Sequence, residues 1–214
     1  MTPRPTPRPE RFTLTVFCGS APGHDPLYRA AAVEVGTAIG RHGMDLVYGG
    51  GHVGLMGAVA DAALRAGAHV TGVIPAALQA REAVHEELTE LVLVDSMHER
   101  KTIMSERADG FLALPGGPGT LEELTEQWTW AQLGLHEKPC GVLNVGGYFD
   151  PLLAFVAGMR DRGFTHPRYV DMLVVADQVD DALERLRSYT PPARSQASPG
   201  AELTAELAAA AVLP

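Results

Sequence analysis

The residues best suited to chemistry form the stretch LPGGPGTLEEL, residues 114–124. Three glycines and two prolines stand there between an apolar segment and a segment that opens with two glutamates. A backbone without side chains can bring several N–H groups to one anion, and the dipole of a helix that begins there adds to the attraction. We therefore predict that Gly117, Gly119 and Thr120 bind a phosphate monoester about one helical turn from the two glutamates.

Two further features of this stretch narrow its function. Thr120, with Glu123 three residues later, matches the capping-box pattern and is the predicted N-cap of the helix. That structural role of Glu123 is compatible with a catalytic one. No Lys-Ser or Lys-Thr pair follows the glycines, so the stretch is not a Walker A loop, and a single phosphate fits better than a nucleoside triphosphate.

A cluster of charged residues precedes this stretch, in DSMHERKTIM (95–104). His98, Glu99, Arg100 and Lys101 stand there where a predicted strand ends and a helix begins. Such a run is usually a solvated helix face. Here the segment lies between two predicted parallel strands, so its beginning should face the same edge of the sheet as the glycines. Arg100 can then orient a carboxylate or clamp a phosphate.

A second glycine-rich turn, VYGGGHVGLMG (47–57), has Gly49, Gly51 and Gly54 at G-x-G-x-x-G spacing between a predicted strand and a predicted helix. The spacing favours a dinucleotide site, but a nicotinamide-binding domain also places Asp or Glu about 20 residues on, at the end of the next strand. That strand ends instead in GVIP (72–75), which argues against a dehydrogenase.

Short apolar segments recur along the chain, separated by segments with helical periodicity. This pattern predicts an α/β fold, doubly wound, with a mostly parallel sheet of about seven strands and helices on both faces. We expect a flexible tail over 1–10, a single nucleotide-binding domain over 11–188, and a disordered or partly helical tail over 189–214. The predicted strands are 12–20, 45–51, 69–75, 90–96, 110–116, 138–145 and 171–177.

Composition excludes several classes of function. The formal charge of −9 and the pI near 5.3 argue against a nucleic-acid partner. No apolar run reaches the roughly 20 residues that cross a bilayer, and no apolar stretch follows the N-terminal charges, so we expect a cytoplasmic protein without a membrane partner.

Cys18 and Cys140 are expected to be buried thiols, and Trp128 and Trp130 to pack in the core or a dimer. The eight histidines show no metal-ligand spacing.

Several sequence blocks, in order between about residue 13 and residue 165, resemble the LOG (Lonely Guy) family of cytokinin riboside 5′-monophosphate phosphoribohydrolases, often mislabelled as lysine decarboxylases. The blocks are FCGS, YGGG-x-x-GLMG, GVIP, MHERK, LPGG-x-GT-x-x-E, TWAQLG, KP and GYFDPLL. The resemblance implies a Rossmann-like fold, usually a homodimer. From the residues themselves we expect no metal and no cofactor. The resemblance also implies a small-molecule substrate, an N6-substituted AMP, whose N-glycosidic bond is hydrolysed to the adenine derivative and ribose 5-phosphate.

The resemblance further implies roles for individual residues. The family's catalytic Arg falls on Arg100, and its catalytic Glu falls on Glu123. Pro118 stands where many members carry Tyr, so the loop lacks one N–H donor and an aromatic wall, which affects the fit of the base or ribose more than the reaction. The positions that line the family's nucleotide site correspond to Glu82, Lys101, Gly116, Gly117, Pro118, Gly119, Thr120, Leu121, Glu122 and Thr129.

Breaking an N-glycosidic bond builds positive charge on the ribose, which a carboxylate can stabilise while it takes a proton from the attacking water. Glu123 is predicted in this role, with Arg100 favouring its ionised form. The sequence does not determine the substituent on N6 or whether plain AMP is the physiological substrate.

Two other classes of protein are alternatives. A carrier of the same fold, similar to the molybdenum-cofactor carriers, would bind a nucleotide without hydrolysing it, although the presence of both Arg100 and Glu123 in their motifs favours catalysis. A lysine decarboxylase would need a lysine that forms a Schiff base with pyridoxal phosphate. Of the two lysines, Lys138 precedes a strand and Lys101 belongs to the nucleotide block, so this reading is the weaker one.

Overall fold

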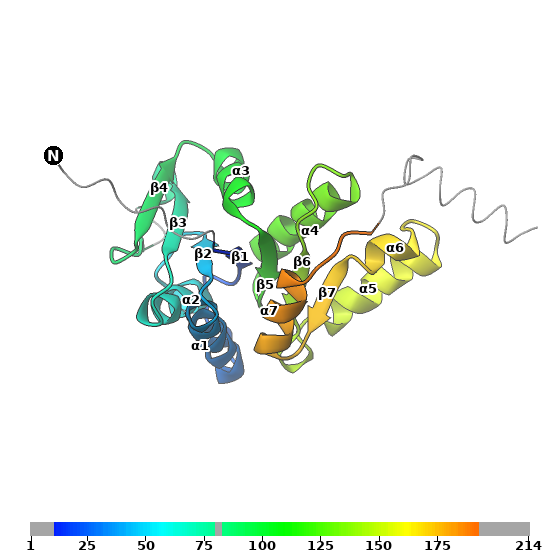
Figure 1. Cartoon of the computed structure of the whole chain (residues 1–214), viewed down its shortest axis with the longest axis horizontal. Coiled ribbons are helices and arrows are strands. Elements are labelled where there is room, and N and C mark those ends of the chain that lie inside the picture. The colour runs from blue at the N-terminus through cyan, green and yellow to red at the C-terminus, as the bar shows by residue number, and fades with distance from the viewer. Residues whose placement is uncertain (1–10, 80–82, 193–214) are drawn as a thin grey trace, which may run out of the picture.

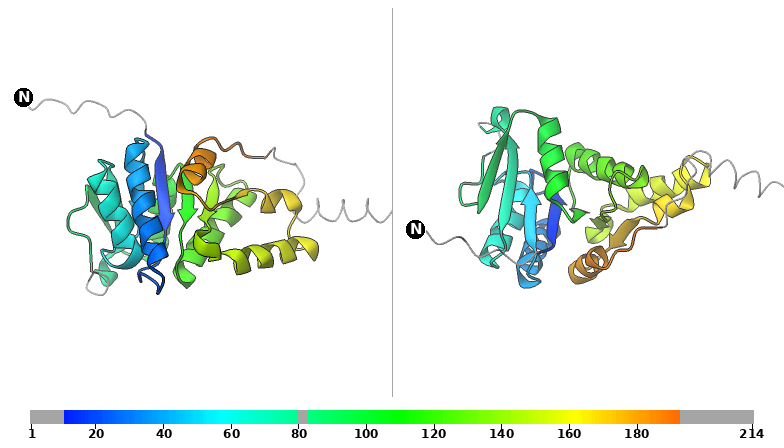
Figure 2. Two further views of the ribbon diagram at one scale, coloured as in Figure 1. Left: turned by 90° about the horizontal axis from the view of Figure 1, so that it is seen from below. Right: turned by 45° about the horizontal axis from the view of Figure 1, so that its top comes forward.

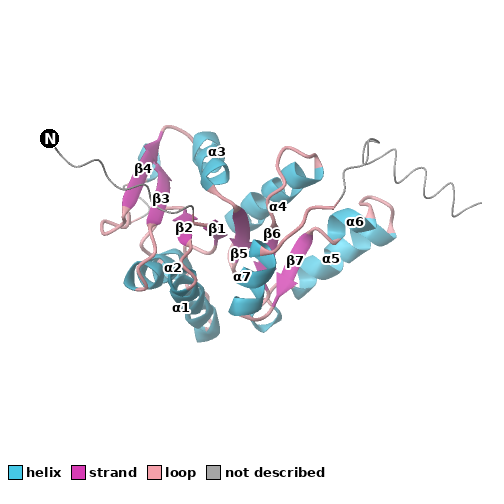
Figure 3. Cartoon of the chain, in the orientation of Figure 1, coloured by secondary structure: helices cyan, strands magenta, loops and turns pink. Residues whose placement is uncertain are grey.

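The computed structural model describes residues 11–79 and 83–192. This part of the chain forms a seven-stranded sheet in the order β4-β3-β2-β1-β5-β6-β7, with every neighbouring pair parallel (Figures 1 and 3). The predicted α/β fold class and its parallel sheet are confirmed. The strands are β1 (Thr13–Phe17), β2 (Asp45–Tyr48), β3 (Val70–Pro75), β4 (Glu90–Val94), β5 (Gly110–Ala113), β6 (Cys140–Leu143) and β7 (Leu173–Ala176).

Helices cover both faces of this sheet (Figure 2). Helices α1, α2 and α7 share one apolar cluster with the strands, and α3 to α6 share the other. The helices are α1 (Pro26–Arg41), α2 (Gly54–Arg65), α3 (Met97–Arg107), α4 (Pro118–Gln132), α5 (Asp150–Asp161), α6 (Pro167–Val170) and α7 (Val179–Arg187), with 3₁₀ turns η1 (Ala76–Leu78) and η2 (Val145–Gly147).

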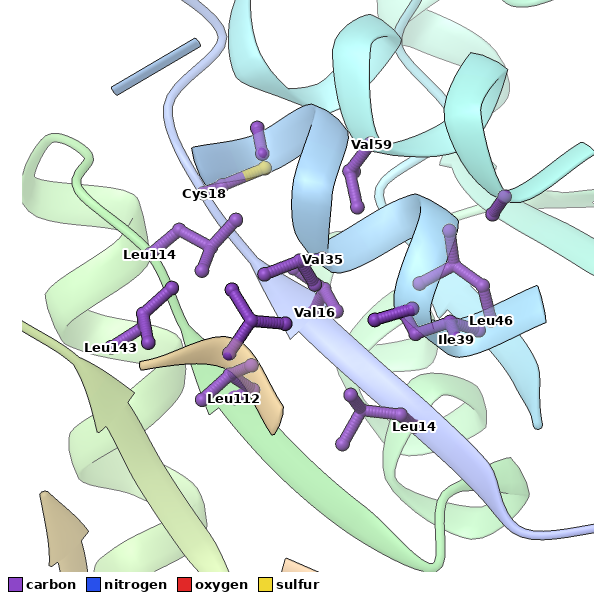
Figure 4. Close-up of a cluster of buried hydrophobic side chains, with 14 of the residues drawn as sticks. Leu14, Val16, Cys18, Val35, Ile39, Leu46, Val59, Leu112, Leu114 and Leu143 are labelled. Carbon is purple, nitrogen blue, oxygen red and sulfur yellow. The ribbon is translucent and has the colours of Figure 1, made fainter. Parts of the chain in front are cut away.

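The alternation of side chains along each strand decides which cluster a residue joins. In β1, Leu14 and Val16 join the first cluster and Phe17 joins the second. Figure 4 shows the first cluster, where the β1 side chains lie beside Val35 and Ile39 of α1. Complete burial of each such side chain stabilises the fold by about 1.5–3 kcal/mol, so β1, the central strand of the sheet, is firmly held.

Helices α1 and α2 approach each other closely because a glycine stands at their contact. A Cβ atom at Gly36 would lie 2.2 Å from the carbonyl oxygen of Val59 and 2.8 Å from Cβ of Ala62. Glycine there lets the two helices pack backbone to backbone. This contact holds α2, and with it the glycine-rich turn that precedes α2.

The cysteines and Trp128 follow the predictions made for them. Cys18 and Cys140 are buried and free, and burial raises the pKa of both thiols. Trp128 is buried, and its Nε1–H donates to the carbonyl oxygen of Tyr169 at 2.9 Å, so it is a core residue. Trp130 is half-buried on the same helix.

Most of the two predicted tails lies outside the described residues, and the predicted domain boundaries stay a prediction. Tyr189, at the start of the second predicted tail, packs partly buried against the first apolar cluster. Within the ranges that the structure describes, no helix is long and apolar enough to span a bilayer.

The half-buried His136 makes the stability of the fold depend on pH. Burial, followed by the positive charge of Lys138, lowers the pKa of His136 to about 4, whereas an unfolded histidine titrates near 6.5. Between these values the unfolded chain binds a proton that the folded chain does not, so the free energy of unfolding falls as the pH falls from about 6.5 to 4. We expect His136→Gln to reduce this loss by about 1–2 kcal/mol, allowing for solvent screening of a half-buried ring. Urea unfolding of the wild-type and His136→Gln proteins between pH 7 and 4.5 checks this. If the free energy of unfolding falls equally with pH in both proteins, the prediction is contradicted.

Candidate active site

The sheet changes its direction of winding between β1 and β5, with β2, β3 and β4 on one side and β6 and β7 on the other. The turns after β1 and β5 leave the sheet at this switch point, where α/β sheets bind ligands. The two turns contact each other, because Gly19 N–H donates to the carbonyl oxygen of Pro115 at 3.1 Å. A cleft of about 280 Å³ lies here, lined by Gly19–Gly23, Tyr28, Leu55, Pro115–Gly117 and Tyr148.

The structure corrects the predicted start of α4. The helix begins at Pro118, and its N-cap is Gly117, which makes no side-chain hydrogen bond to the helix. Proline is favoured at the first helical position because its φ is already helical and its missing N–H has no partner there anyway. Thr120 is therefore the third residue of the helix, and its predicted N-cap role is wrong. The capping role of Glu123 is wrong as well, since Glu123 lies six residues past the N-cap and not three.

The glycines of this turn differ in what surrounds them. A Cβ atom at Gly116 would lie 2.1 Å from Oγ1 of the buried Thr120 and 2.9 Å from the nitrogen of Gly19, so packing explains glycine there. At Gly117 and Gly119, both exposed, a Cβ atom would meet nothing of the described chain within 4 Å. The first amides of a helix have no carbonyl partner within it. The turn therefore presents accessible backbone beside the cleft, as an anion site requires.

Arg100 is buried in the first turn of α3, with only 6% of its surface exposed. Its Nε–H donates to the carbonyl oxygen of Val73 at 3.0 Å, and its Nη2–H donates to that of Gly49 at 2.8 Å. A Cβ atom at Gly49 would lie 2.1 Å from Nη2, so glycine at that position lets the guanidinium reach the backbone. Arg100 therefore connects α3 to the carboxyl ends of β2 and β3, and the alternative of a solvated helix face is excluded for it.

Helix α3 begins with a variant of the capping box, in which the glutamate bonds to the residue before the N-cap. Ser96 is the N-cap, and its hydroxyl accepts a hydrogen bond from Glu99 N–H at 3.1 Å. The Glu99 carboxylate in turn accepts from Asp95 N–H at 2.8 Å. The spacing of Ser96 and Glu99 matches the capping-box pattern as well as that of Thr120 and Glu123 does. This pair fixes where α3 begins and so where Arg100 lies.

Glu123 lies in the second turn of α4 and is half-buried. Its negative charge acts on Cys18, which follows β1: burial is the main reason that the pKa of this thiol is raised, and the Glu123 carboxylate raises it further. Glu123 is therefore near the carboxyl end of β1, where the turn that lines the cleft begins.

An ion triad joins α3 to α4. Lys101 Nζ lies 2.5 Å from Glu122 Oε1 and 2.9 Å from Glu126 Oε1. Burial acts to lower the pKa of Lys101, but hydrogen bonds to the two carboxylates outweigh it, so the pKa is raised and the ammonium stays charged. The triad brings together Lys101 and Glu122, both predicted site residues. Their sequence neighbours, Arg100 and Glu123, therefore lie on two helices that are in contact.

The other predicted site residues do not all lie together. Gly116, Gly117, Pro118, Gly119, Thr120 and Leu121 form the turn and the first part of α4, and Pro118 and Leu121 are exposed. Thr129 is exposed further along α4, nine residues after Thr120 and so about 14 Å away along the helix axis. The structure does not bring Thr129 to the predicted phosphate-binding turn. Glu82 lies outside the described residues.

Sequence reasoning missed a residue that contacts this turn. Tyr148 follows β6 in the chain, and its hydroxyl donates to the carbonyl oxygen of Gly116 at 2.5 Å. Its ring packs edge-on against Tyr28 with 5.6 Å between centroids, and both rings line the cleft. The only signal was its place in the block GYFDPLL, and nothing in the spacing linked Tyr148 to the glycines.

Comparisons with known proteins identify the family of the chain. A family model described as "Possible lysine decarboxylase" matches residues 56–186. A relative from Oryza sativa subsp. japonica, named probable cytokinin riboside 5′-monophosphate phosphoribohydrolase, is 50% identical over 179 residues, covering 84% of this chain and 73% of the relative. One from Arabidopsis thaliana, named cytokinin riboside 5′-monophosphate phosphoribohydrolase, is 46% identical over 178 residues, covering 83% of this chain and 84% of the relative.

Solved structures resemble the fold at much lower identity. The molybdenum cofactor binding protein of Rippkaea orientalis has a TM-score of 0.64 at 20% identity, covering 84% of this chain and 97% of that one. A molybdenum cofactor carrier protein of Chlamydomonas reinhardtii has a TM-score of 0.63 at 19% identity, covering 84% of this chain and all of that one. At such identities the likeness concerns the fold alone. The close relatives and the family model together place the chain in the LOG family of cytokinin riboside 5′-monophosphate phosphoribohydrolases.

Proposed function

We propose that this protein hydrolyses the N-glycosidic bond of an adenosine 5′-monophosphate, plain or N6-substituted, and releases the free base and ribose 5-phosphate. The observation that carries the proposal is the open backbone at the start of α4, with Glu123 on the same helix one turn on. The names of the close relatives support the same substrate class.

The proposed anchor for the substrate is the 5′-phosphate. The N–H groups of Gly117, Gly119 and Thr120, together with the N-terminal end of the α4 dipole, are positioned to bind an anion. Pro118 contributes no N–H to this set. Binding energy from the phosphate, remote from the reacting bond, is available to orient C1′ of the ribose.

Glu123 is the proposed catalytic carboxylate. As the bond between base and ribose breaks, positive charge grows on the ribose ring, and a carboxylate beside it stabilises that charge. The same carboxylate takes a proton from the attacking water, whose oxygen bonds to C1′ while the electron pair of the broken bond leaves with the base. The proton then passes from the carboxylate to the departing base, directly or through solvent, which releases the neutral base and restores the ionised carboxylate. The proposed role of Arg100 is to favour the ionised carboxylate by its fixed positive charge. None of these steps calls for a metal or an organic cofactor.

The assembly and compartment are also proposals. A homodimer in the cytoplasm is what the family resemblance implies. Exposed apolar side chains of α5 and of the segments after α4 and α5 support a partner surface: Leu133, Leu135, Phe155 and Phe164 are 61–80% exposed. The net charge of −9 favours a small-molecule partner over nucleic acid.

The dependence on the 5′-phosphate tests the proposal. We expect ribose 5-phosphate to be released from AMP and from N6-isopentenyl-AMP. For adenosine and N6-isopentenyladenosine, kcat/KM should be at least 10²-fold lower, because the anchoring interactions are lost. Chromatographic detection of the free base measures hydrolysis of the nucleotides and of the nucleosides. Nucleosides that react as fast as their monophosphates would refute the phosphate anchor, and nucleotide binding without any release would favour the carrier alternative.

A further inference from the structure

Three side chains outside the cleft converge at the far end of the glycine-rich turn that joins β2 to α2. His85 Nε2 lies 2.9 Å from Asp61 Oδ1, and His52 Nε2 lies 3.9 Å from the same oxygen. The two imidazole rings are 4.5 Å apart between centroids. One nitrogen or oxygen of each residue lies within 4.8 Å of those of the other two. We call these three residues the histidine–aspartate cluster.

Backbone pairing builds this cluster. His52 N–H donates to the carbonyl oxygen of Ala83 at 2.7 Å, and His85 N–H donates to that of Gly50 at 3.1 Å. These bonds form an antiparallel bridge between Gly51 and Val84 that holds the two histidines side by side. Asp61 reaches them from the second turn of α2, the helix that the turn introduces. The three ligand atoms are therefore held from three separate segments of the chain.

From this geometry we propose that the histidine–aspartate cluster binds a divalent transition-metal ion such as Zn²⁺. Ligand atoms at tetrahedral positions around Zn²⁺ are about 3.3 Å apart, between the two distances measured to Asp61. Two imidazoles and one carboxylate suit Zn²⁺ and its transition-metal neighbours and not Mg²⁺ or Ca²⁺, which prefer oxygen alone.

The burial of the ligands is graded in a way that fits a metal site with one open position. His85 is 2% exposed, while the side chains of Asp61 and His52 are 34% and 54% exposed. His85 is therefore a fixed inner ligand, and His52 can rotate to close the longer distance from the solvent side. The fourth position faces the solvent and is filled by water.

The site is distinct from the proposed hydrolytic centre. Its metal would tie the segment 83–85 to the turn that also supplies Gly49, whose carbonyl oxygen accepts from Arg100. The ion would thus support the scaffold that holds Arg100. Sequence spacing could not predict this cluster, because its members are 9 and 24 residues apart in the sequence.

Binding the metal changes which ring nitrogen of His85 carries the hydrogen. Its Nδ1 now accepts a hydrogen bond from Glu87 N–H at 3.3 Å, so the ring hydrogen is on Nε2 and is donated to Asp61. A metal on Nε2 requires the neutral ring to carry its hydrogen on Nδ1 instead, which removes the acceptor for the Glu87 amide. Glu86 and Glu87 are exposed, so this turn is free to adjust. The Glu87 amide is therefore a reporter of metal at this site.

The experiment is calorimetric titration of the full chain, without a polyhistidine tag, with ZnCl₂, repeated with CoCl₂ under an absorption spectrometer. We expect one ion bound per chain, with tetrahedral Co²⁺ absorption, and no binding of Mg²⁺. His52→Ala should weaken Zn²⁺ binding at least tenfold. The matched control is His42→Ala, because His42 Nε2 lies 3.0 Å from Asp180 Oδ1, a similar pair without a second histidine. That variant should bind as wild type does.

Two results would overturn the proposal. One is a wild-type protein that binds no Zn²⁺, and the other is a His52→Ala variant that binds it as tightly as wild type. Unfolding temperatures with EDTA present show whether the variant keeps its fold. If the variant does not fold, the wild-type protein alone still tests the proposal. Zn²⁺ must then shift the signal of the Glu87 amide in a ¹⁵N-correlated NMR spectrum, and an unshifted signal would refute the site.

Discussion

Replacing Glu123 by glutamine is expected to lower kcat for hydrolysis of AMP by about 10³-fold, within the range that a positioned general base contributes. Glutamine keeps the volume of the half-buried side chain but can neither take a proton from water nor oppose the growing positive charge on the ribose. The turn that we propose binds the phosphate precedes Glu123 at the start of the same helix and acts through backbone groups. Nucleotide affinity should therefore stay within about threefold of wild type. Single-turnover release of ribose 5-phosphate and equilibrium binding of AMP measure the two quantities separately.

Glu184→Gln is the matched control for this prediction, because Glu184 is an exposed helical glutamate on α7, against the opposite face of the sheet. It should leave kcat and affinity unchanged. The assignment fails if Glu123→Gln retains more than about a tenth of the wild-type rate. A variant that loses nucleotide binding and rate together would instead make Glu123 part of the binding site.

The fold was predictable because parallel strands covered on both faces are continuous apolar runs. The segments 12–20 and 110–116 contain β1 and β5, and each also extends into the turn that lines the cleft. The strand ends were therefore predicted too late, since apolar character continues beyond the hydrogen-bonded ladder. The start of α4 was wrong for a different reason. Two local signals competed, proline at the first position and a capping box two residues later, and only the structure shows that proline prevailed.

The candidate site was predictable where its residues are close in sequence. Contacts between distant segments could not be predicted: the carbonyl groups that hold Arg100 belong to residues 27 and 51 positions away. Tyr148 reaches Gly116 from 32 residues away. Such contacts depend on strand order, which apolar periodicity does not encode. One consequence is that Gly49, predicted within a dinucleotide-like turn, owes its glycine to the guanidinium of Arg100 beside it.

Replacing Arg100 by methionine is expected to reduce both activity and stability. Methionine has a similar length but donates no hydrogen bond, so the carbonyl groups of Val73 and Gly49 lose donors in a buried place, at a cost of about 2–4 kcal/mol in the free energy of unfolding. The positive charge that we assign to keeping Glu123 ionised is also lost. We expect kcat/KM for AMP to fall at least 10²-fold. Urea unfolding and steady-state kinetics measure the two effects.

Arg107→Met, on the same helix, separates this role from the general loss of an arginine. Arg107 pairs with Glu90 near the surface, with the two side chains 39% and 38% exposed, so its loss should cost no more than about 1 kcal/mol and leave kcat/KM unchanged. Gly49→Ala provides a second approach, since the new Cβ would displace the guanidinium while the arginine stays in place. If position is what matters, Gly49→Ala must lower kcat/KM nearly as much as Arg100→Met. An active Gly49→Ala protein would mean that the charge of Arg100 acts without its hydrogen bond to the residue that follows β2.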